Sequence, residues 1–298
     1  MKKVFFNVTI PTALILSIIC SCGRFGNEDK KSGHKQRIVC ISKQYNEIIF
    51  ALKAQDDIVA VDLTSNYPPE ITKLPNVGYH RALSIESILA MRPTLIIQDN
   101  NIGPEHVVRQ IQDLKIPMKT FGHYQNTISG TDSLIREMGA YFHKEQRADS
   151  LCRKLDSDMK TALESAKQYK DHPKVLIIHF GQASNIYLIM TKKNVASQMI
   201  EWAGGITAVD DEREMKQISP EIVALSDPDI ILLTDFGYDR LGGSPQKISE
   251  LPGVASTKAY KNNRIYRIME HDVVYLGPRT GENVLLFQKL IHQNGHTK

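Results

Sequence analysis

The sequence predicts an α/β fold with two similar lobes, a long helix that bridges them, and a ligand cleft between the lobes. Three observations predict it: short apolar runs alternate with helical segments, one segment recurs, and a stretch of helical periodicity separates the two copies. Strands that alternate with helices are typical of parallel sheets with covered faces. The folded part, roughly 260 residues, also exceeds a typical single domain of about 100 to 150 residues.

The predicted elements fall into three successive parts. The N-terminal lobe, residues 37–127, has expected strands at 38–42, 58–62, 95–98 and 118–121 and helices at 44–52, 84–91 and 104–114. Apolar residues at helical spacing over residues 128–170 predict one bridging helix, with a break near Gly139 as the alternative. The C-terminal lobe, residues 171–298, has expected strands at 175–179, 186–189, 230–234 and 264–269 and helices at 195–203, 220–225 and 281–291.

The recurring segment covers residues 84–97, which align without gaps on residues 219–232. Each copy begins with a serine that can cap a helix and places a glutamate in the first turn. A short apolar helix, a proline and an apolar strand follow. The same boundary chemistry in both copies indicates two related, Rossmann-like lobes. We expect the ligand between them, because open α/β sheets bind ligands beyond the carboxyl ends of their strands.

Residues 1–22 have the features of a lipoprotein signal. A basic start and an interrupted apolar stretch, too short for a good membrane span, lead to Ile19-Cys20-Ser21-Cys22. This order resembles the lipobox of bacterial lipoproteins, which predicts Cys22 as the lipidated first residue of the mature protein. The alternative is an ordinary cleaved signal with a soluble product. Residues 23–36 are polar and contain glycine, so a flexible tether is expected there.

Charge and cysteine content narrow the function classes. The formal net charge is only +4, which is too small to argue for a nucleic-acid partner or a polybasic membrane surface. In the folded part, Cys40 lies in an apolar strand and Cys152 in a helix. Two buried thiols are therefore expected rather than a disulfide framework, which is typical of small secreted domains.

Tyr79 and Arg81 stand two residues apart just before the first repeated helix. In an extended backbone they project to one side, and His80 projects to the other side, toward solvent. A guanidinium beside a phenol lowers the pKa of the phenol and favours the phenolate. Tyrosinate is among the side chains that hold haem iron. The pair therefore suggests a site for ferric haem, although alone it also fits a packed tyrosine beside a solvated arginine.

Together these features resemble the helical-backbone substrate-binding lipoproteins of ABC importers for iron complexes, cobalamin and haem. The resemblance covers residues 37–291 and is nearest to the haem-binding branch, through Val77-Gly78-Tyr79-His80-Arg81, Ala203-Gly204-Gly205 and Leu276-Gly277-Pro278-Arg279-Thr280. It implies that Tyr79 ligates haem iron and that Arg81 supports the phenolate. Haem would be the transported ligand, delivered to an ABC permease dimer with ATPase subunits by a lipid-anchored monomer in the cell envelope or periplasm.

Two more residues are candidates for contacts with haem. His179 ends an apolar strand, and the resemblance implies a second iron ligand opposite Tyr79 or a propionate contact. A histidine satisfied by backbone groups is the alternative. Arg279, in a Gly-Pro-Arg turn, could pair with a propionate or order the C-terminal loop.

Glu86 and Glu221 occupy matching positions in the two copies. In the family that the chain resembles, glutamates at these positions dock onto arginines of the two permease subunits. The resemblance therefore implies a docking role for both residues. The alternative is that each is an acid favoured at a helix N-terminus by the helix dipole.

Common enzyme signatures are missing from the folded part: it has no Gly-x-Ser-x-Gly, His-Glu-x-x-His, Gly-x-Gly-x-x-Gly or Cys-x-x-Cys pattern. We therefore expect neither an enzyme nor a catalytic cofactor. The nearest alternative keeps the fold and binds a ferric siderophore or cobalamin. A remoter one is a tetrapyrrole chelatase with His179 as its base. The number of haems bound and the membrane that holds the anchor stay open.

Overall fold

The structure is a computed structural model of the whole chain, and it describes residues 36–122 and 124–293. The predicted signal, the lipidation site Cys22 and most of the tether lie outside the described residues. The described part belongs to one compact unit that begins at Gln36. In these ranges no helix combines the length and the apolar character that crossing a membrane requires.

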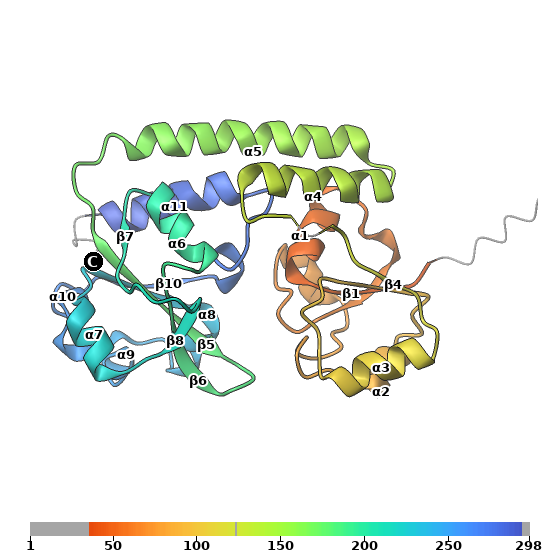
Figure 1. Cartoon of the computed structure of the whole chain (residues 1–298), viewed down its shortest axis with the longest axis horizontal. Coiled ribbons are helices and arrows are strands. Elements are labelled where there is room, and N and C mark those ends of the chain that lie inside the picture. The colour runs from red at the N-terminus through yellow and green to blue at the C-terminus, as the bar shows by residue number, and fades with distance from the viewer. Residues whose placement is uncertain (1–35, 123, 294–298) are drawn as a thin grey trace, which may run out of the picture. The chain divides into compact units, whose positions relative to one another are not determined.

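The N-terminal lobe is a parallel sheet covered by helices on both faces (Figure 1). Alternate residues of its central strand β1 enter two different cores: Ile38 and Cys40 pack on the side of helices α1 and α4 (Ile128–Tyr141), and Val39 and Ile41 on the side of α2 and α3. Burial on both faces explains the continuous apolar strand sequences. In the sheet order, the strands are β2 (Ile58–Val61), β1 (Ile38–Ile41), β3 (Leu95–Gln98) and β4 (Met118–Lys119), and the helices are α1 (Lys43–Ala51), α2 (Ile85–Ala90) and α3 (Glu105–Asp113).

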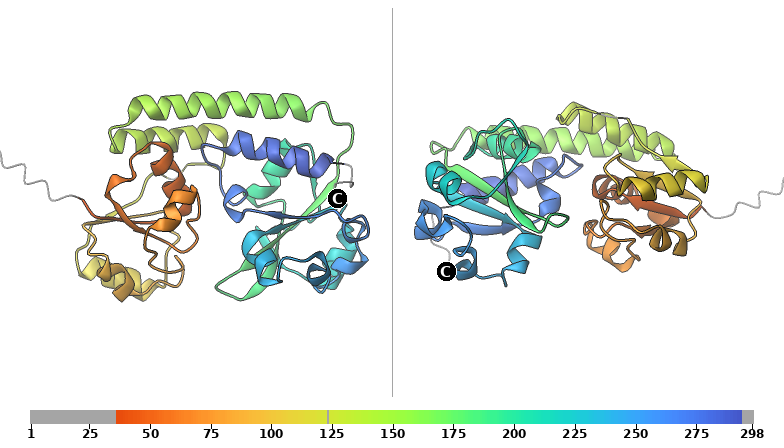
Figure 2. Two further views of the ribbon diagram at one scale, coloured as in Figure 1. Left: turned by 180° about the vertical axis from the view of Figure 1, so that it is seen from behind. Right: turned by 60° about the horizontal axis from the view of Figure 1, so that its bottom comes forward.

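The bridge consists of two helices, α4 (Ile128–Tyr141) and α5 (Glu145–Ala166), so the expectation of one helix over residues 128–170 is corrected. The chain reverses direction just after α4, where His143 adopts a left-handed φ of 56°. The break at residues 142–144 lies near Gly139, as the alternative expected, although Gly139 itself is still part of α4. A Cβ atom built there would lie 2.4 Å from Cβ of Ala148 on α5, so the glycine lets the two helices pack closely. Helix α5 alone spans both lobes (Figures 1 and 2).

The C-terminal lobe contains a mixed sheet with the order β10-β9-β5-β6-β8, in which β7 also pairs with β5. β10, β9 and β5 are parallel, whereas β6 is antiparallel to β5 and to β8. The strands are β5 (Lys174–Gly181), β6 (Ile186–Met190), β7 (Ile206–Thr207), β8 (Met215–Gln217), β9 (Ile230–Thr234) and β10 (Ile265–Ile268). The helices are α6 (Val195–Trp202), α7 (Pro220–Ser226), α8 (Asp235–Arg240), α9 (Pro245–Ile248), α10 (Lys258–Lys261) and α11 (Thr280–His292).

The repeated segments form equivalent units in the two lobes. Oγ of Ser84 accepts a hydrogen bond from the backbone N–H of Ser87 at the start of α2, and Oγ of Ser219 accepts one from Ile222 at the start of α7. Each helix leads into a strand, β3 or β9, that lies parallel to the first strand of its lobe. Both helices lie on the side of their lobes away from α5 (Figure 1). The predicted fold of two α/β lobes bridged by a long helix is confirmed.

Candidate functional site

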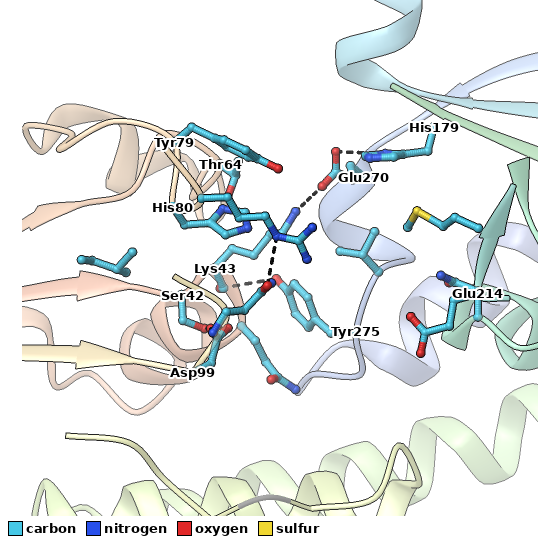
Figure 3. A pocket seen from close by; sticks show the side chains of 17 residues that line it. Ser42, Lys43, Thr64, Tyr79, His80, Asp99, His179, Glu214, Glu270 and Tyr275 are labelled. Atoms are coloured by element: carbon cyan, nitrogen blue, oxygen red, sulfur yellow. Dashed lines mark hydrogen bonds and ion pairs between the residues drawn. The ribbon is translucent and has the colours of Figure 1, made fainter. Parts of the chain in front are cut away.

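A cavity of about 280 Å³ lies between the two lobes (Figure 3). Most of its walls come from loops that follow the carboxyl ends of strands, where open α/β sheets commonly bind ligands, and Glu214 and Met215 line it as well. The N-terminal lobe contributes the loop after β1, the loop with Tyr79 and the loop after β3. The C-terminal lobe contributes the end of β5 and the segment after β10, which begins with the 3-10 helix η4 (Glu270–Asp272). The cleft predicted between the lobes is therefore present.

The segment of Tyr79 is a tight turn rather than an extended strand. Gly78 has a φ of 100°, which favours glycine, and the backbone N–H of Ala82 donates to the carbonyl of Tyr79 over 2.8 Å. The turn directs Tyr79, His80 and Arg81 to the same cavity. The expectation that His80 is exposed to solvent is therefore wrong: 14% of its side chain is accessible, and its Nδ1 lies 3.6 Å from Oδ2 of Asp62.

Tyr79 is half-buried, and its ionisation reflects two opposing effects. Burial raises the pKa of the phenol above its usual value, and the guanidinium of Arg81 lowers it without reversing the shift. Nε of Arg81 donates to Oδ1 of Asn101 over 3.0 Å, which fixes the guanidinium near the turn. The predicted effect of Arg81 thus has the expected sign. Without a ligand, however, the raised pKa leaves Tyr79 a neutral phenol at neutral pH.

His179 reaches the cavity from the end of β5 on the opposite lobe. Its Nδ1 lies 3.3 Å from Oε2 of Glu270, and the other carboxylate oxygen of Glu270 forms an ion pair with Nζ of Lys43. Figure 3 shows the Glu270 carboxylate between the phenol of Tyr79 and the ring of His179. Burial lowers the pKa of His179, opposed by Glu270, and so favours the neutral imidazole that can bind a metal.

Glu270 remains ionised although it is buried. Burial by itself would raise its pKa, but the nearby Lys43 and His179 outweigh this effect, and the net pKa is lowered. The cavity thus contains an anion that belongs to the protein. Among the described residues, no group of three or more His, Cys, Asp and Glu side chains is arranged to hold a bare metal ion.

Arg279 does not line this cavity. Its Nε donates to Oε1 of Glu47 over 2.9 Å, its Nη2 donates to Oδ1 of Asp272 over 2.7 Å, and its guanidinium lies 3.5 Å from the centre of the Tyr67 ring. These contacts tie the C-terminal loop to helix α1 of the other lobe. The placement favours the ordering role over the propionate contact.

Glu86 and Glu221 are exposed in the first turns of α2 and α7. Oε2 of Glu86 accepts a hydrogen bond from Oγ of Ser84 over 2.7 Å. Hydrogen bonds lower the pKa of each carboxyl group. The largest effect comes from the side chain of Ser84 for Glu86 and from the backbone for Glu221. Both side chains are therefore ionised at neutral pH, and neither lines the cavity.

The periplasmic binding protein family matches residues 38–271 of this chain. The chain belongs to that family. Among solved structures, the periplasmic haem-binding protein RhuT from Roseiflexus sp. RS-1, in its apo form, shares 31% identity and a TM-score of 0.79, and the match covers 88% of this chain and 100% of that one. The predicted family is confirmed, and a substrate-binding role follows from it.

Two curated relatives of this periplasmic binding protein show the breadth of the family. The ABC transporter substrate-binding lipoprotein YvrC of Bacillus subtilis is 26% identical, over 84% of this chain and 77% of its own length. The vitamin B12-binding protein of Pectobacterium atrosepticum is 25% identical, over 72% of this chain and 74% of its own length. The relatives are binding proteins rather than enzymes.

Sequence reasoning missed Lys43 and Glu270 in this periplasmic binding protein. Both had a local signal, because each lies just beyond the carboxyl end of a strand, β1 or β10. No local pattern predicts that the two residues contact each other, since 227 positions separate them in the sequence. A systematic inspection of polar residues that follow predicted strands would have selected both as cavity candidates.

Proposed function

We propose that this protein binds one ferric haem in the cleft and delivers it to an ABC permease. The observation that carries the proposal is the placement of Tyr79 at the cavity, with Arg81 beside it and His179 on the facing lobe. A phenolate and a neutral imidazole are both ligands of haem iron. The haem-binding name of the RhuT relative, at 31% identity, supports the same ligand class.

Haem is large relative to the cavity between the lobes. The cavity of about 280 Å³ is at the lower limit of sites for drug-sized ligands, which span about 300 to 1,000 Å³, and haem is a large ligand of this kind. We infer that the two lobes separate to admit the ligand. The charged contact between Lys43 and Glu270 is one of the contacts across the cavity that such opening breaks, beside the hydrogen bond from the Tyr275 hydroxyl to the carbonyl of Lys43.

The first test is a haemin titration of protein that lacks residues 1–22. We expect stoichiometric uptake with a change in the Soret band, and Tyr79→Phe should weaken binding by at least about 100-fold because an iron–phenolate bond is lost. Tyr141→Phe, a change at a partly exposed tyrosine outside the cavity, should bind as wild type does. An unchanged spectrum and affinity in Tyr79→Phe would contradict the assigned ligand.

Two rival ligands and one rival activity have separate readouts. A corrinoid is the second candidate because of the vitamin B12-binding relative, and tighter binding of cobalamin than of haemin would favour it. A ferric siderophore would suit a cleft rich in arginine, whereas here Arg81 shares the wall with Tyr79 and several acids. A chelatase would release free iron or porphyrin from haemin, whereas a carrier returns its ligand intact.

Delivery rests on the two exposed glutamates and on the N-terminal cysteine. We infer that Glu86 and Glu221 meet basic side chains on the two subunits of a permease dimer, itself driven by ATPase subunits, and that Cys22 anchors the protein to the membrane. Glu86→Arg with Glu221→Arg should abolish haem-dependent growth and leave haemin affinity unchanged, because both residues lie outside the cavity. Normal growth of the double variant would exclude this docking role.

A further inference from the structure

The ion pair between Lys43 and Glu270 joins the two lobes inside the cavity (Figure 3). Lys43 is the first residue of α1 in the N-terminal lobe, and Glu270 is the first residue of η4 in the C-terminal lobe. The side chains are 14% and 8% exposed. Removing two charges from water is costly, so a buried ion pair is weak evidence for a purely stabilising role.

Glu270 is also incompletely satisfied in the described structure. Its Oε2 and Nδ1 of His179 are both buried and lack a hydrogen-bond partner of good geometry, although they lie 3.3 Å apart. Buried polar atoms in native proteins are rarely left without a partner, and such cases call for an explanation. The carboxylate also lies between Tyr79 and His179 (Figure 3), which is the space that a ligand of iron held by these residues would need.

We propose that Glu270 is an internal substitute for a carboxylate of the ligand. In the free protein it neutralises Lys43 and fills the space between Tyr79 and His179. When the ligand binds, one of its carboxylates forms the ion pair with Lys43, and the side chain of Glu270 moves out of the cavity. This inference rests on the proposed function, because the haem propionates are the carboxylates concerned.

The exchange has a simple charge balance. One carboxylate replaces another at the ammonium group of Lys43, so no unpaired cation is left in the cavity. The backbone N–H of Glu270 donates to Oδ1 of Asp235 over 3.0 Å, so η4 can stay in place while the side chain moves. A ligand without carboxylates would displace Glu270 and leave Lys43 unpaired. Lys43 therefore determines the specificity for a ligand with a carboxylate. Glu270 lowers the affinity for any ligand, because the ligand has to displace it.

The test compares haemin with haemin dimethyl ester, in which both propionates are capped. Wild type should prefer haemin by about tenfold or more, the effect of one charge-assisted hydrogen bond. Glu270→Gln should bind both ligands several-fold more tightly and keep the same preference, because the internal competitor is gone and Lys43 remains. Lys43→Met should bind the two ligands about equally. Lys160→Met, on the exposed face of α5, should behave as wild type does.

A second variant serves as the control for a loss of stability in Lys43→Met. Lys43→Met leaves a buried carboxylate unpaired, which destabilises proteins strongly, so Lys43→Met/Glu270→Gln removes both charges and should also show equal affinities. A wild-type preference that persists in the double variant, or a Glu270→Gln protein that binds haemin no more tightly, would overturn the inference and leave haem binding intact. Failure of wild type to bind haemin would instead overturn the proposed function.

Discussion

At the scale of single residues, Tyr79 shows how position within a turn changes the chemistry of a side chain. Its ring packs against His80 with 4.5 Å between the centroids, and burial raises its pKa although Arg81 is near. A neutral phenol must lose its proton to bind ferric iron as phenolate. Binding therefore releases a proton, and affinity should rise with pH below the pKa of Tyr79.

Arg81→Ala should move this pH dependence. Without the guanidinium the pKa of Tyr79 rises further, because burial and the acids Glu270 and Asp62 remain. Haemin affinity near pH 7 should fall, because a smaller fraction of the phenol is ionised at that pH. The curve of affinity against pH should shift to higher pH with the fold intact by circular dichroism. Arg153→Ala, on the exposed surface of α5, is the matched control, and coincident curves for Arg81→Ala and wild type would refute the supporting role.

At the scale of elements, the repeated helix boundaries were predictable and the bridge was only partly so. Ser84 and Ser219 cap their helices as the sequence indicates, since capping depends on residues three positions apart. The reversal between α4 and α5 has a weaker signal. No proline or glycine stands at residues 142–144, and the left-handed residue there is His143. Close packing of the two helices, which is a tertiary effect, stabilises this turn.

Gly139→Leu should therefore destabilise the bridge. A Cβ atom at this position would lie 2.4 Å from Cβ of Ala148, so α4 and α5 would have to separate. We expect a loss of about 1 to 3 kcal/mol in the free energy of unfolding, the usual cost of overpacking. Ala140→Leu, at the exposed neighbouring position, should change stability little. Equal urea midpoints for the two variants would show that the helices do not depend on this close approach.

At the scale of the whole molecule, a buried hydrogen-bond network joins the two lobes. It connects helix α1 of the N-terminal lobe to the C-terminal loop that holds Arg279. Nε2 of His271 lies 2.7 Å from Oε2 of Glu47, and Arg279 binds the other oxygen of the same carboxylate. Burial opposes ionisation of Glu47, but these two partners outweigh it, and its pKa is lowered. A lowered folded-state pKa stabilises the fold above the unfolded pKa of about 4.3, and this stabilisation is lost as pH falls through the folded-state pKa.

Glu47→Gln should accordingly lower stability near neutral pH and flatten its dependence on acid. Breaking a buried pair costs about 3 to 5 kcal/mol, because Arg279 keeps only Asp272 of its two carboxylate partners and His271 loses the carboxylate that it contacts. Urea unfolding at pH 7 and at pH 3, which lies below the unfolded pKa of the carboxyl group, measures both effects. Glu164→Gln, at an exposed position of α5, should match wild type at both values. A Glu47→Gln protein as sensitive to acid as wild type would place the acid-labile contact elsewhere.

The sequence by itself determined the α/β class, the two related lobes, the capped helices and the segment that holds the candidate iron ligand. These features depend on short-range patterns, namely hydrophobic periodicity, caps and neighbouring side chains. Only the tertiary structure decided that residues 78–82 form a turn, that β6 and β8 run antiparallel, and that Arg279 serves the lobe contact rather than the cavity. It also brought Lys43 to Glu270. Such outcomes depend on contacts between residues far apart in the chain, whose pairing no local pattern specifies.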